Sequence, residues 1–242
     1  EPHLVLKEGT KENYLGGAAA VANHLSTFCK EVKFVTLAGE EKDNLNFIKR
    51  SLKKNIKVKF FNKKNSPTII KKRFIDKISQ SKLLGVYSIN EENLQKNLEN
   101  RFINCIKKYA SSCDLILVSD YGHGFISNKA AKIFSSSKKF FSLNAQINAS
   151  NRGYHSLRKY KKIDNLIINE NELRHEMRDK VENIEKLSLK LIKDLKVNRL
   201  TVTRGKNGAI LIEKNGKTVS SPAFANKVID KVGAGDAMLV VI

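Results

Sequence analysis

Short apolar runs alternate with longer amphipathic segments along most of the chain, a pattern typical of strands and crossover helices in a mostly parallel sheet. The predicted strands are the apolar runs at residues 33–37, 114–119, 140–144, 165–169 and 199–203. The predicted helices are the amphipathic segments at residues 17–28, 43–54, 91–111, 127–136, 171–178 and 183–195. Two further strands, at residues 208–213 and 217–220, are expected to form a hairpin. This α/β pattern directs attention to the carboxyl ends of the strands, where such sheets bind ligands.

One region breaks the alternation. Between residues 57 and 89 three strand-like runs follow one another without a helix, at residues 58–61, 68–76 and 83–88. We interpret them as a small β-sheet lid over the ligand crevice, formed by residues of about 1–15 and 57–90; the alternative is a meander that extends the main sheet. Because no linker or internal repeat divides the chain, we expect one domain over residues 1–242.

Composition narrows the class of protein. The chain has 242 residues and is 41% hydrophobic, which is ample for a core. Its apolar runs, such as Leu115 to Val118, are far too short to cross a bilayer. The cysteines are Cys29, Cys105 and Cys113, an odd number without a CxxC pair, which argues against a disulfide framework or a zinc ribbon. A reducing cytoplasm is the expected compartment.

Charge suggests a second class of function. The 45 Lys and Arg residues exceed the 24 Asp and Glu residues, for a net charge of +21, which in isolation suggests a nucleic-acid binder. The lysines, however, are scattered through nearly every segment without aromatic interleaving or an RNA-binding motif. We therefore expect a solvated basic surface that attracts phosphorylated small molecules, with neither a nucleic-acid nor a membrane partner.

A glycine-rich turn directly before a carboxylate, Gly233-Ala234-Gly235-Asp236, is the most informative motif. If a helix begins there, its unpaired N–H groups would point at an anion. Asp236 could then take the proton of an attacking hydroxyl while the amides stabilise a transferred phosphoryl group. The alternative is an ordinary tight turn followed by an N-cap Asp.

Together with other motifs along the chain, this turn resembles the pattern of a known protein family. The segment from Gly16 to Ala22 and the segment from Asp230 to Asp236 resemble the two signature regions of the ribokinase-type (phosphofructokinase-B) carbohydrate kinases. Four more landmarks occur in the family's order, at residues 67–73, 119–124, 169–172 and 203–208. The likeness is greatest to the heptose-phosphate kinase branch, the kinase domain of ADP-heptose synthase. It implies a ribokinase-like fold with a lid, and transfer of a phosphoryl group from ATP with Mg²⁺ to a sugar or sugar phosphate.

The resemblance assigns roles at the transfer end. It makes Asp236 the catalytic base and the amides of Gly233, Ala234 and Gly235 the anion hole. It gives Asn169 and Glu172 the placing of hydrated Mg²⁺ and the triphosphate, with Glu172 reaching the metal through water; the alternative is a capping arrangement of the following helix. The residues that it assigns to the nucleotide-side loop are Thr203, Gly205 and Gly208.

On the acceptor side, Gly16 and Gly17 would let backbone amides meet the sugar. Lys71 and Arg73 are two positions apart on a lid strand and so share a face, which suits a phosphate on the acceptor. Asp120 ends a predicted strand and could bond sugar hydroxyls; a turn or N-cap role is the alternative.

Departures from the family pattern leave the acceptor open. Ala20 stands where the family usually has a sugar-binding Asn, and Asn144-Ala145-Gln146 replaces an Asp-Pro-Lys run. Amides at Asn144, Gln146, Asn148 and Asn151 could form a neutral binding site instead. These changes motivate an alternative function, a non-catalytic nucleotide- or sugar-phosphate-binding module attached to a nucleotidyltransferase. His123 stands where that branch commonly has Lys, and a structural role is one reading of it.

The chain also looks clipped relative to the family. It lacks the family's first core strand, and it ends shortly after Asp236. We expect a longer polypeptide, with a fused nucleotidyltransferase domain as in some members of that branch. Because family lids sometimes pair between subunits, a homodimer through the lid is expected as well.

Overall fold

The computed structural model describes residue 5 and residues 7–147, 151, 153, 155–224 and 233–241. Its main sheet has six strands in the order β10-β9-β8-β7-β6-β5. These strands are β5 (Leu115–Asp120), β6 (Phe140–Ala145), β7 (Asn165–Asn169), β8 (Arg199–Thr203), β9 (Ala209–Glu213) and β10 (Thr218–Ser221). Strands β5 to β8 run parallel, and β9 and β10 add an antiparallel edge. The predicted mostly parallel α/β sheet is confirmed.

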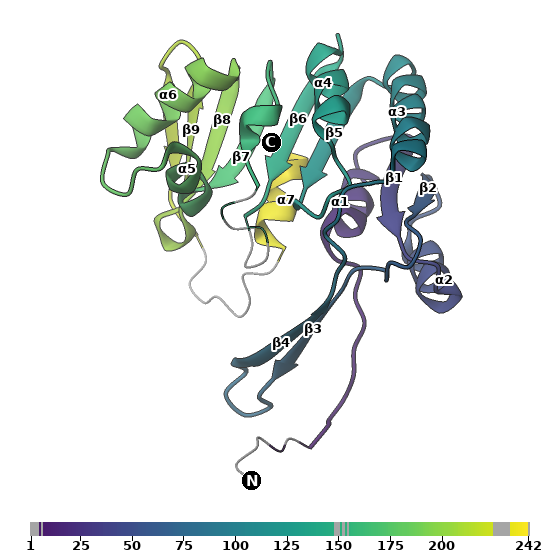
Figure 1. Ribbon diagram of the computed structural model, residues 1–242. Helices are drawn as coiled ribbons and strands as arrows, with labels where there is room; N and C mark the ends of the chain where they lie inside the picture. Colours follow the sequence, from purple (N-terminus) through teal and green to yellow (C-terminus); the bar gives the residue numbers. More distant parts are fainter. Residues whose placement is uncertain are drawn as a thin grey trace.

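Helices cover both faces of this sheet (Figure 1). One face carries α3 (Lys96–Ser111), α4 (Asn128–Ser136), α5 (Glu170–Met177) and α6 (Ile184–Leu195), and the other carries α1 (Gly17–Leu25) and α7 (Ala234–Val241). Strand β7 shows why both faces need cover. Leu166 and Ile168 pack into the large core, whereas Ile167 between them packs against Val21 of α1 and Leu239 of α7. A strand that is apolar on both faces is typical of a buried parallel sheet.

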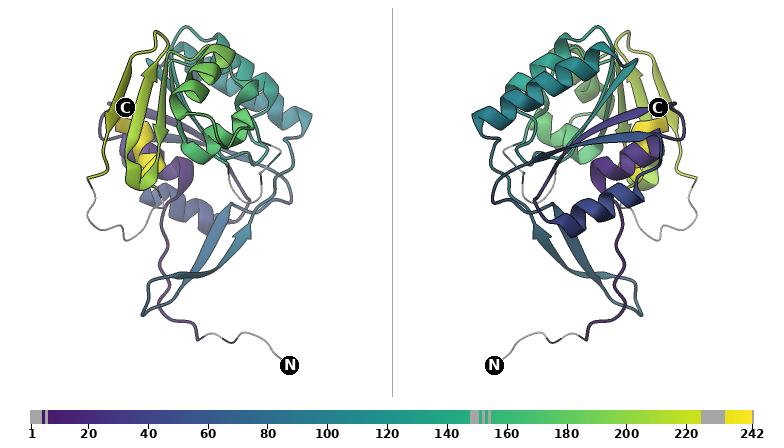
Figure 2. Two further views of the ribbon diagram at one scale, coloured as in Figure 1. Left: turned by 90° about the vertical axis from the view of Figure 1, so that its left-hand side faces the viewer. Right: turned by 90° about the vertical axis from the view of Figure 1, so that its right-hand side faces the viewer.

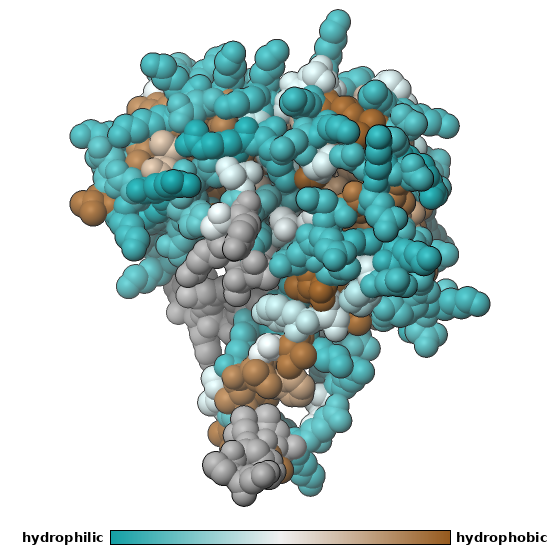
Figure 3. All heavy atoms as spheres, in the orientation of Figure 1, coloured by the Kyte–Doolittle hydropathy of each residue, from teal (hydrophilic) through white to brown (hydrophobic). Residues whose placement is uncertain are grey.

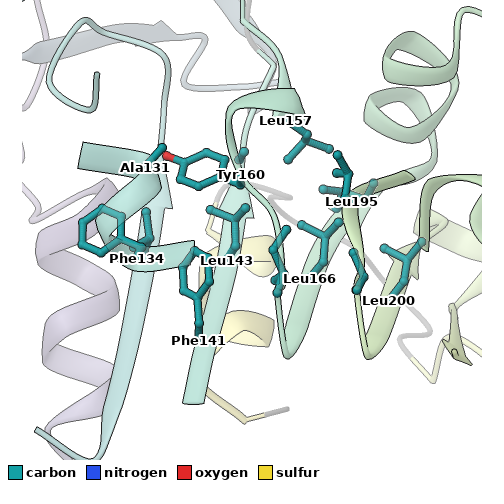
Figure 4. Packing of buried hydrophobic residues seen from close by; sticks show 14 of the residues in the cluster. Ala131, Phe134, Phe141, Leu143, Leu157, Tyr160, Leu166, Leu195 and Leu200 are labelled. Carbon is teal, nitrogen blue, oxygen red and sulfur yellow. The ribbon is translucent and has the colours of Figure 1, made fainter. Parts of the chain in front are cut away.

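The large core lies between the sheet and helices α3 to α6. Large side chains that are almost fully buried fill it, among them Tyr160, Phe141, Leu143, Leu166 and Leu200 (Figure 4). Tyr160 follows a short 3-10 helix, η1 (Leu157–Lys159), which brings it over β6. This core holds the carboxyl ends of β5 to β8 in fixed register, so that residues following each strand meet at one edge.

Strand β2 requires a correction to the predicted lid. The run at residues 58–61 lies in β2 (Ile56–Asn62), which pairs in parallel with β1 (Val32–Ala38) through the crossover helix α2 (Lys42–Ser51). Its apolar side chains serve the body: Ile56 packs with the β1 and α1 residues, and Phe61 enters the large core. Because Ile56 and Phe61, near the two ends of β2, are buried in the body, β2 pairs with β1. The lid therefore contains two of the three strands that were expected.

The lid is an antiparallel hairpin of β3 (Ile70–Ile75) and β4 (Lys82–Ser88) that projects from the body (Figures 1 and 2). Its turn is closed by Asp76, whose Oδ1 accepts hydrogen bonds from the Ile78 and Ser79 amides and from the Ser79 hydroxyl. The described residues 7–15 form no helix or strand. The hairpin is therefore joined to the body only at its root, close to the strand ends.

The remaining differences concern boundaries. The helix expected from residue 91 begins at Lys96; residues 91–95 form neither helix nor strand, and Gln95, the N-cap, is extended. There the buried Lys63 ammonium donates to Asn90 Oδ1 at 2.6 Å and to the Glu92 carbonyl at 2.5 Å. In the part of the chain that the structure describes, we find no helix with the length and apolar character of a membrane span.

Candidate active site

The glycine-rich turn leads directly into a helix. Gly233 has a φ of +84°, which glycine adopts without strain, and its carbonyl accepts a hydrogen bond from the Ala237 amide at 2.9 Å. Asp236 thereby lies in the first turn of α7, next to the free N–H groups of the helix start. Asp230, which opens the motif, lies outside the described residues, as does Asn148.

Asp236 is held from the main sheet. Its Oδ1 accepts hydrogen bonds from the Tyr121 hydroxyl and from Gln146 Nε2, each at 2.9 Å. Tyr121 directly follows β5 and Gln146 directly follows β6, and the Gln146 amide extends the ladder to the Asp120 carbonyl at 2.9 Å. The structure therefore brings the predicted base and the predicted amide Gln146 together, and adds Tyr121, which the sequence did not single out.

Asn144 supports the contact between Gln146 and Asp236. It is buried at the end of β6, where its Nδ2 donates to the Ile167 carbonyl at 2.8 Å and its Oδ1 accepts from Gln146 Nε2 at 3.0 Å. Both functional atoms of the Asn144 amide are thus engaged inside the protein. Asn144 therefore holds Gln146 from the interior of the sheet and does not line the site next to it.

The first glycine motif meets the same tyrosine. Gly17 begins α1 with a φ of +53°, and a Cβ on it would lie 3.3 Å from the Tyr121 ring. Gly16 is the N-cap of α1, where an added Cβ would meet nothing within 4 Å. The starts of α1 and α7 therefore both lie beside Tyr121, and Gly17 provides the room for its ring.

The lid contributes a cation to this region. The Lys71 ammonium lies 5.5 Å from the centroid of the Tyr87 ring, its partner across the hairpin. Burial, and then the charge of Arg73, lowers the pKa of Lys71, while the negative charges of Glu91 and Asp236 oppose this shift. Lys71 is thus within electrostatic reach of Asp236. Arg73 lies further out on the same face and is exposed.

Two further residues, His123 after β5 and Glu91 after β4, lie on the predicted acceptor side. His123 is buried and its ring stacks parallel to that of Tyr121, with centroids 6.5 Å apart. Its Nδ1 lies 3.0 Å from Glu91 Oε1. Burial lowers the pKa of His123 although the hydrogen bond to Glu91 raises it, so the ring is neutral at neutral pH. Glu91 was expected in a helix, which is why it was missed.

Asp120 turns away from this cluster. It is 4% exposed, and its carboxylate accepts hydrogen bonds from the Tyr160 hydroxyl at 2.7 Å and the Gly122 amide at 3.0 Å, with the Lys159 ammonium at 2.7 Å. Burial favours its protonated form, but the charges of Lys159 and His155 and the hydrogen bonds from Lys159 and Tyr160 together outweigh this and lower the pKa of Asp120. Both oxygens are engaged inside the protein. The structure therefore does not bring this predicted sugar contact to Asp236.

On the nucleotide side, Asn169 and Glu172 form a capping box at the start of α5. Asn169 Oδ1 accepts from the Glu172 amide at 2.9 Å, and Glu172 Oε2 accepts from the Asn169 amide at 2.8 Å. The other oxygen, Glu172 Oε1, accepts from the Ile147 amide at 3.1 Å. Burial raises the pKa of Glu172 to about 7, against the effect of these hydrogen bonds. The geometry is the capping arrangement that the sequence left as the alternative.

The capping arrangement of Glu172 affects whether the protein can hold Mg²⁺ there. Mg²⁺ requires oxygen ligands in near-octahedral geometry and usually retains several waters. The buried Glu172 carboxylate already binds two backbone amides, and the described residues contain no cluster of three His, Cys, Asp or Glu that could hold a metal. The described side chains therefore do not fit a protein-held magnesium ion.

The predicted nucleotide-side loop follows β8. Thr203 ends that strand opposite Asn169 of β7, so the two lie at neighbouring strand ends. Gly205 has a φ of +57° with open space around it. Gly208 has a φ of +77°, and a Cβ there would overlap the Ser221 carbonyl, so Gly208 allows close packing of the sheet edge. Gly205 thus has room for a ligand beside it.

Residues 1–242 match the profile of the pfkB family carbohydrate kinases. The Bifunctional protein HldE of Nitratiruptor sp. is 26% identical over 248 residues, a match covering 100% of this chain and 50% of that protein. HldE of Campylobacter jejuni strain RM1221 is 27% identical over 245 residues, with the same coverage. The chain thus spans about half the length of these curated relatives.

Solved structures share the fold. Phosphofructokinase-2 from Escherichia coli, in complex with substrates and products, superposes with a TM-score of 0.72 at 15% identity, over 98% of this chain and 78% of that chain. Ribokinase from Giardia lamblia superposes with a TM-score of 0.68 at 16% identity, over 92% of this chain and 69% of that chain. The fold is ribokinase-like, as expected. The match along all 242 residues shows that the chain belongs to the pfkB family of carbohydrate kinases.

Proposed function

We propose that the protein transfers the γ-phosphoryl group of ATP, in the presence of Mg²⁺, to a hydroxyl of a sugar or sugar phosphate. The observation that carries the proposal is the placement of Asp236. Its carboxylate lies in the first turn of α7, is held by residues that follow β5 and β6, and its charge acts on the lid cation Lys71. A carboxylate beside free helix N–H groups has the parts that phosphoryl transfer requires.

In the proposed reaction the acceptor hydroxyl binds beside Asp236. As its oxygen attacks the γ-phosphorus, the proton passes to the Asp236 carboxylate, and the bond to the β-phosphate oxygen breaks with ADP leaving. The amides of Gly233, Ala234 and Gly235 stabilise the charge on the transferred group. Closure of the lid excludes water, so that ATP is not hydrolysed.

The acceptor would bind between the sheet and the lid. Gly16 and Gly17 offer backbone amides beside Tyr121, and Gln146 offers a neutral amide beside Asp236. Lys71 and Arg73 share the inner face of the hairpin and would bind an acceptor phosphate. Similarity to HldE makes a heptose phosphate one acceptor to test.

ATP would lie over the ends of β7 and β8, near Asn169, Thr203, Gly205 and Gly208. Mg²⁺ would arrive bound to the ATP phosphates, as it commonly does in kinases. Because the Glu172 carboxylate is occupied, we assign no step to a magnesium ion held by this residue.

A panel of sugars and sugar phosphates tests the proposal directly. The full-length protein should form ADP and a phosphorylated product with at least one acceptor, and chelation of Mg²⁺ should stop the reaction. D236N should lose at least about 100-fold in kcat while still binding ATP. D43N is a matched control, because Asp43 is an exposed acid in the first turn of α2. Undiminished turnover in D236N would refute the role of Asp236.

The alternative, a non-catalytic nucleotide- or sugar-phosphate-binding module, is favoured by two observations. Ala20 has no polar side chain, and Asn144 is engaged inside the protein. Calorimetric binding of ATP or a sugar phosphate, with no product from any acceptor, would favour it.

We further propose the partners and compartment that accompany this function. The expected fused nucleotidyltransferase domain is supported by the bifunctional HldE relatives. A homodimer through the lid is supported by the apolar side chains that gather over the hairpin (Figure 3). The three free cysteines fit a reducing cytoplasm.

A further inference from the structure

Two side chains from neighbouring strands converge on one oxygen of Asp236. Asp120 and Ala145 are partners in the β5–β6 ladder, so the residues that follow them, Tyr121 and Gln146, emerge side by side. Each donates a hydrogen bond of 2.9 Å to Asp236 Oδ1. Within the described part of the chain, no residue donates to Oδ2. The two carboxylate oxygens are therefore unequal before any ligand arrives.

We propose that Tyr121 and Gln146 are positioning residues that fix the Asp236 carboxylate with Oδ2 turned to the acceptor hydroxyl. The inference rests on the proposed role of Asp236 as the base. In the transfer step the acceptor O–H bond breaks and its proton moves to Oδ2. The electron pair of that bond forms the new bond to the γ-phosphorus, and ADP leaves with the electrons of the broken P–O bond. Oδ1 keeps both of its hydrogen bonds throughout.

The direction of the Gln146 hydrogen bond is set from inside the sheet. The Ile167 carbonyl can only accept, so Asn144 must present its Nδ2 to it, at 2.8 Å. Asn144 Oδ1 then faces Gln146 and must accept from Nε2, at 3.0 Å. The remaining Nε2 hydrogen points to Asp236. A carbonyl in the buried strand β7 thereby determines that Gln146 donates to the carboxylate.

Tyr121 is equally constrained. Burial, and then the charge of Asp236, raises its pKa far above the ordinary value, so its hydroxyl stays protonated and serves as a donor. Its ring lies close to the Gly17 backbone and parallel to the His123 ring. Asn151 Nδ2 also donates to the carbonyls of both Tyr121 and Gln146, at 2.9 Å each. One side chain thus joins the backbones of the two donors.

Both donors are uncharged, which matters for a base. An ammonium or guanidinium at this distance would favour the ionised carboxylate strongly and weaken its affinity for a proton. A phenol and an amide orient the carboxylate with a smaller effect of this kind. The arrangement therefore suits a group that must accept a proton during the reaction.

Kinetics of two variants of the full-length protein test the role. We expect Y121F and Q146L each to lower kcat by about 10- to 100-fold, with the KM for ATP changed by no more than about twofold, because the carboxylate loses its orientation and not its charge. Y160F is the matched control: it also removes a tyrosine-to-carboxylate hydrogen bond, but that bond joins Asp120, and kcat should stay within about twofold. If Y121F and Q146L both keep kcat within about twofold of the wild type, the positioning role is refuted.

A second measurement does not depend on activity. Tyrosine labelled with ¹³C at Cζ gives a signal for each tyrosine of the protein, and Y121F and Y160F identify those of Tyr121 and Tyr160. We expect this signal to move in D236N at neutral pH, and the Tyr160 signal to stay. An unmoved Tyr121 signal would show that the contact is absent and would overturn the inference. A moved signal in a protein that phosphorylates no acceptor would overturn the proposed function, and the catalytic role with it, while leaving the contact established.

Discussion

Glu172 Oε1 accepts a hydrogen bond from the Ile147 amide at 3.1 Å, and so ties the start of α5 to the residue that follows Gln146. The same carboxylate caps α5 through the Asn169 amide. Glu172 is 4% exposed, and burial raises its pKa to about 7. One buried carboxyl group therefore links the start of α5, on the predicted nucleotide side, to the backbone next to Gln146, which contacts the candidate base.

This burial makes stability depend on pH. The unfolded chain releases the Glu172 proton near the ordinary pKa of 4.5, whereas the folded protein holds it until about pH 7. The free energy of unfolding should therefore fall as pH rises from about 4.5 to about 7, by on the order of 2–3 kcal/mol from this group. Urea denaturation between pH 5 and pH 8 measures it.

Substitutions isolate the contribution of this carboxyl. E172Q removes the titrating group, so the fall in stability between pH 5 and pH 7 should shrink by that amount. E185Q is the control, because Glu185 is an exposed acid in the first turn of α6. The same pH dependence in E172Q and wild type would show that Glu172 titrates as an ordinary carboxyl.

The local pattern of apolar and polar residues was sufficient to predict the strands that are buried on both faces. The bounds of β7 and β8 agree with the predicted runs, because short runs of apolar and β-branched residues between polar ends have one stable placement in such a sheet. Strand β2 shows the limit. Its alternation of Lys57 and Lys59 with apolar residues fits a lid strand and an edge strand of the body equally well, and only tertiary packing of Ile56 and Phe61 decides.

The candidate site shows the same limit at the level of side chains. The order of the motifs was enough to predict that Asp236, Gly17 and Gln146 belong to one site, and the structure brings Gln146 to Asp236 and Gly17 to Tyr121. Sequence could not tell that Asp120 points inward while the adjacent Tyr121 points to Asp236, because that depends on Tyr160 and Lys159, 40 and 39 positions away. The one available signal for Tyr121 was its position within the landmark at residues 119–124.

Gly17 should not tolerate a side chain. In G17A the backbone must hold alanine at a φ of +53°, and its Cβ lies 3.3 Å from the Tyr121 ring. We expect about 1–2 kcal/mol of destabilisation from the backbone alone, and a lower kcat as Tyr121 is displaced. Thermal unfolding and steady-state kinetics measure the two effects.

Gly9 provides the control for this substitution. It is exposed, and a Cβ there would meet nothing within 4 Å. G9A should behave as the wild type in both measurements. A G17A protein with wild-type stability and turnover would mean that the start of α1 does not need glycine.

The outer face of the lid hairpin should mediate self-association. Phe74, Leu84 and Val86 share this face, opposite that of Lys71, and are 39%, 48% and 47% exposed. Burying an apolar face of this kind against a second copy would remove it from water. L84D should raise the dimer dissociation constant by at least about 10-fold in sedimentation velocity. V181D, at a valine that is 92% exposed in the body, is the control; a wild type that remains monomeric at every concentration would exclude the dimer.

The inner face of the same hairpin should distinguish phosphorylated from neutral acceptors. Lys71 lies within electrostatic reach of Asp236, whereas Lys72, the next residue of β3, points to the opposite face. If an acceptor phosphate binds Lys71, K71Q should raise the KM for a sugar phosphate by about 10- to 100-fold and leave the KM for ATP within about twofold, because only the acceptor contact is lost. K72Q removes the same charge from the same strand and should leave both constants unchanged. Equal effects of the two variants would mean that the lid acts through its overall charge; an unchanged KM for the sugar phosphate in K71Q would place the acceptor phosphate elsewhere or show that the acceptor is a neutral sugar.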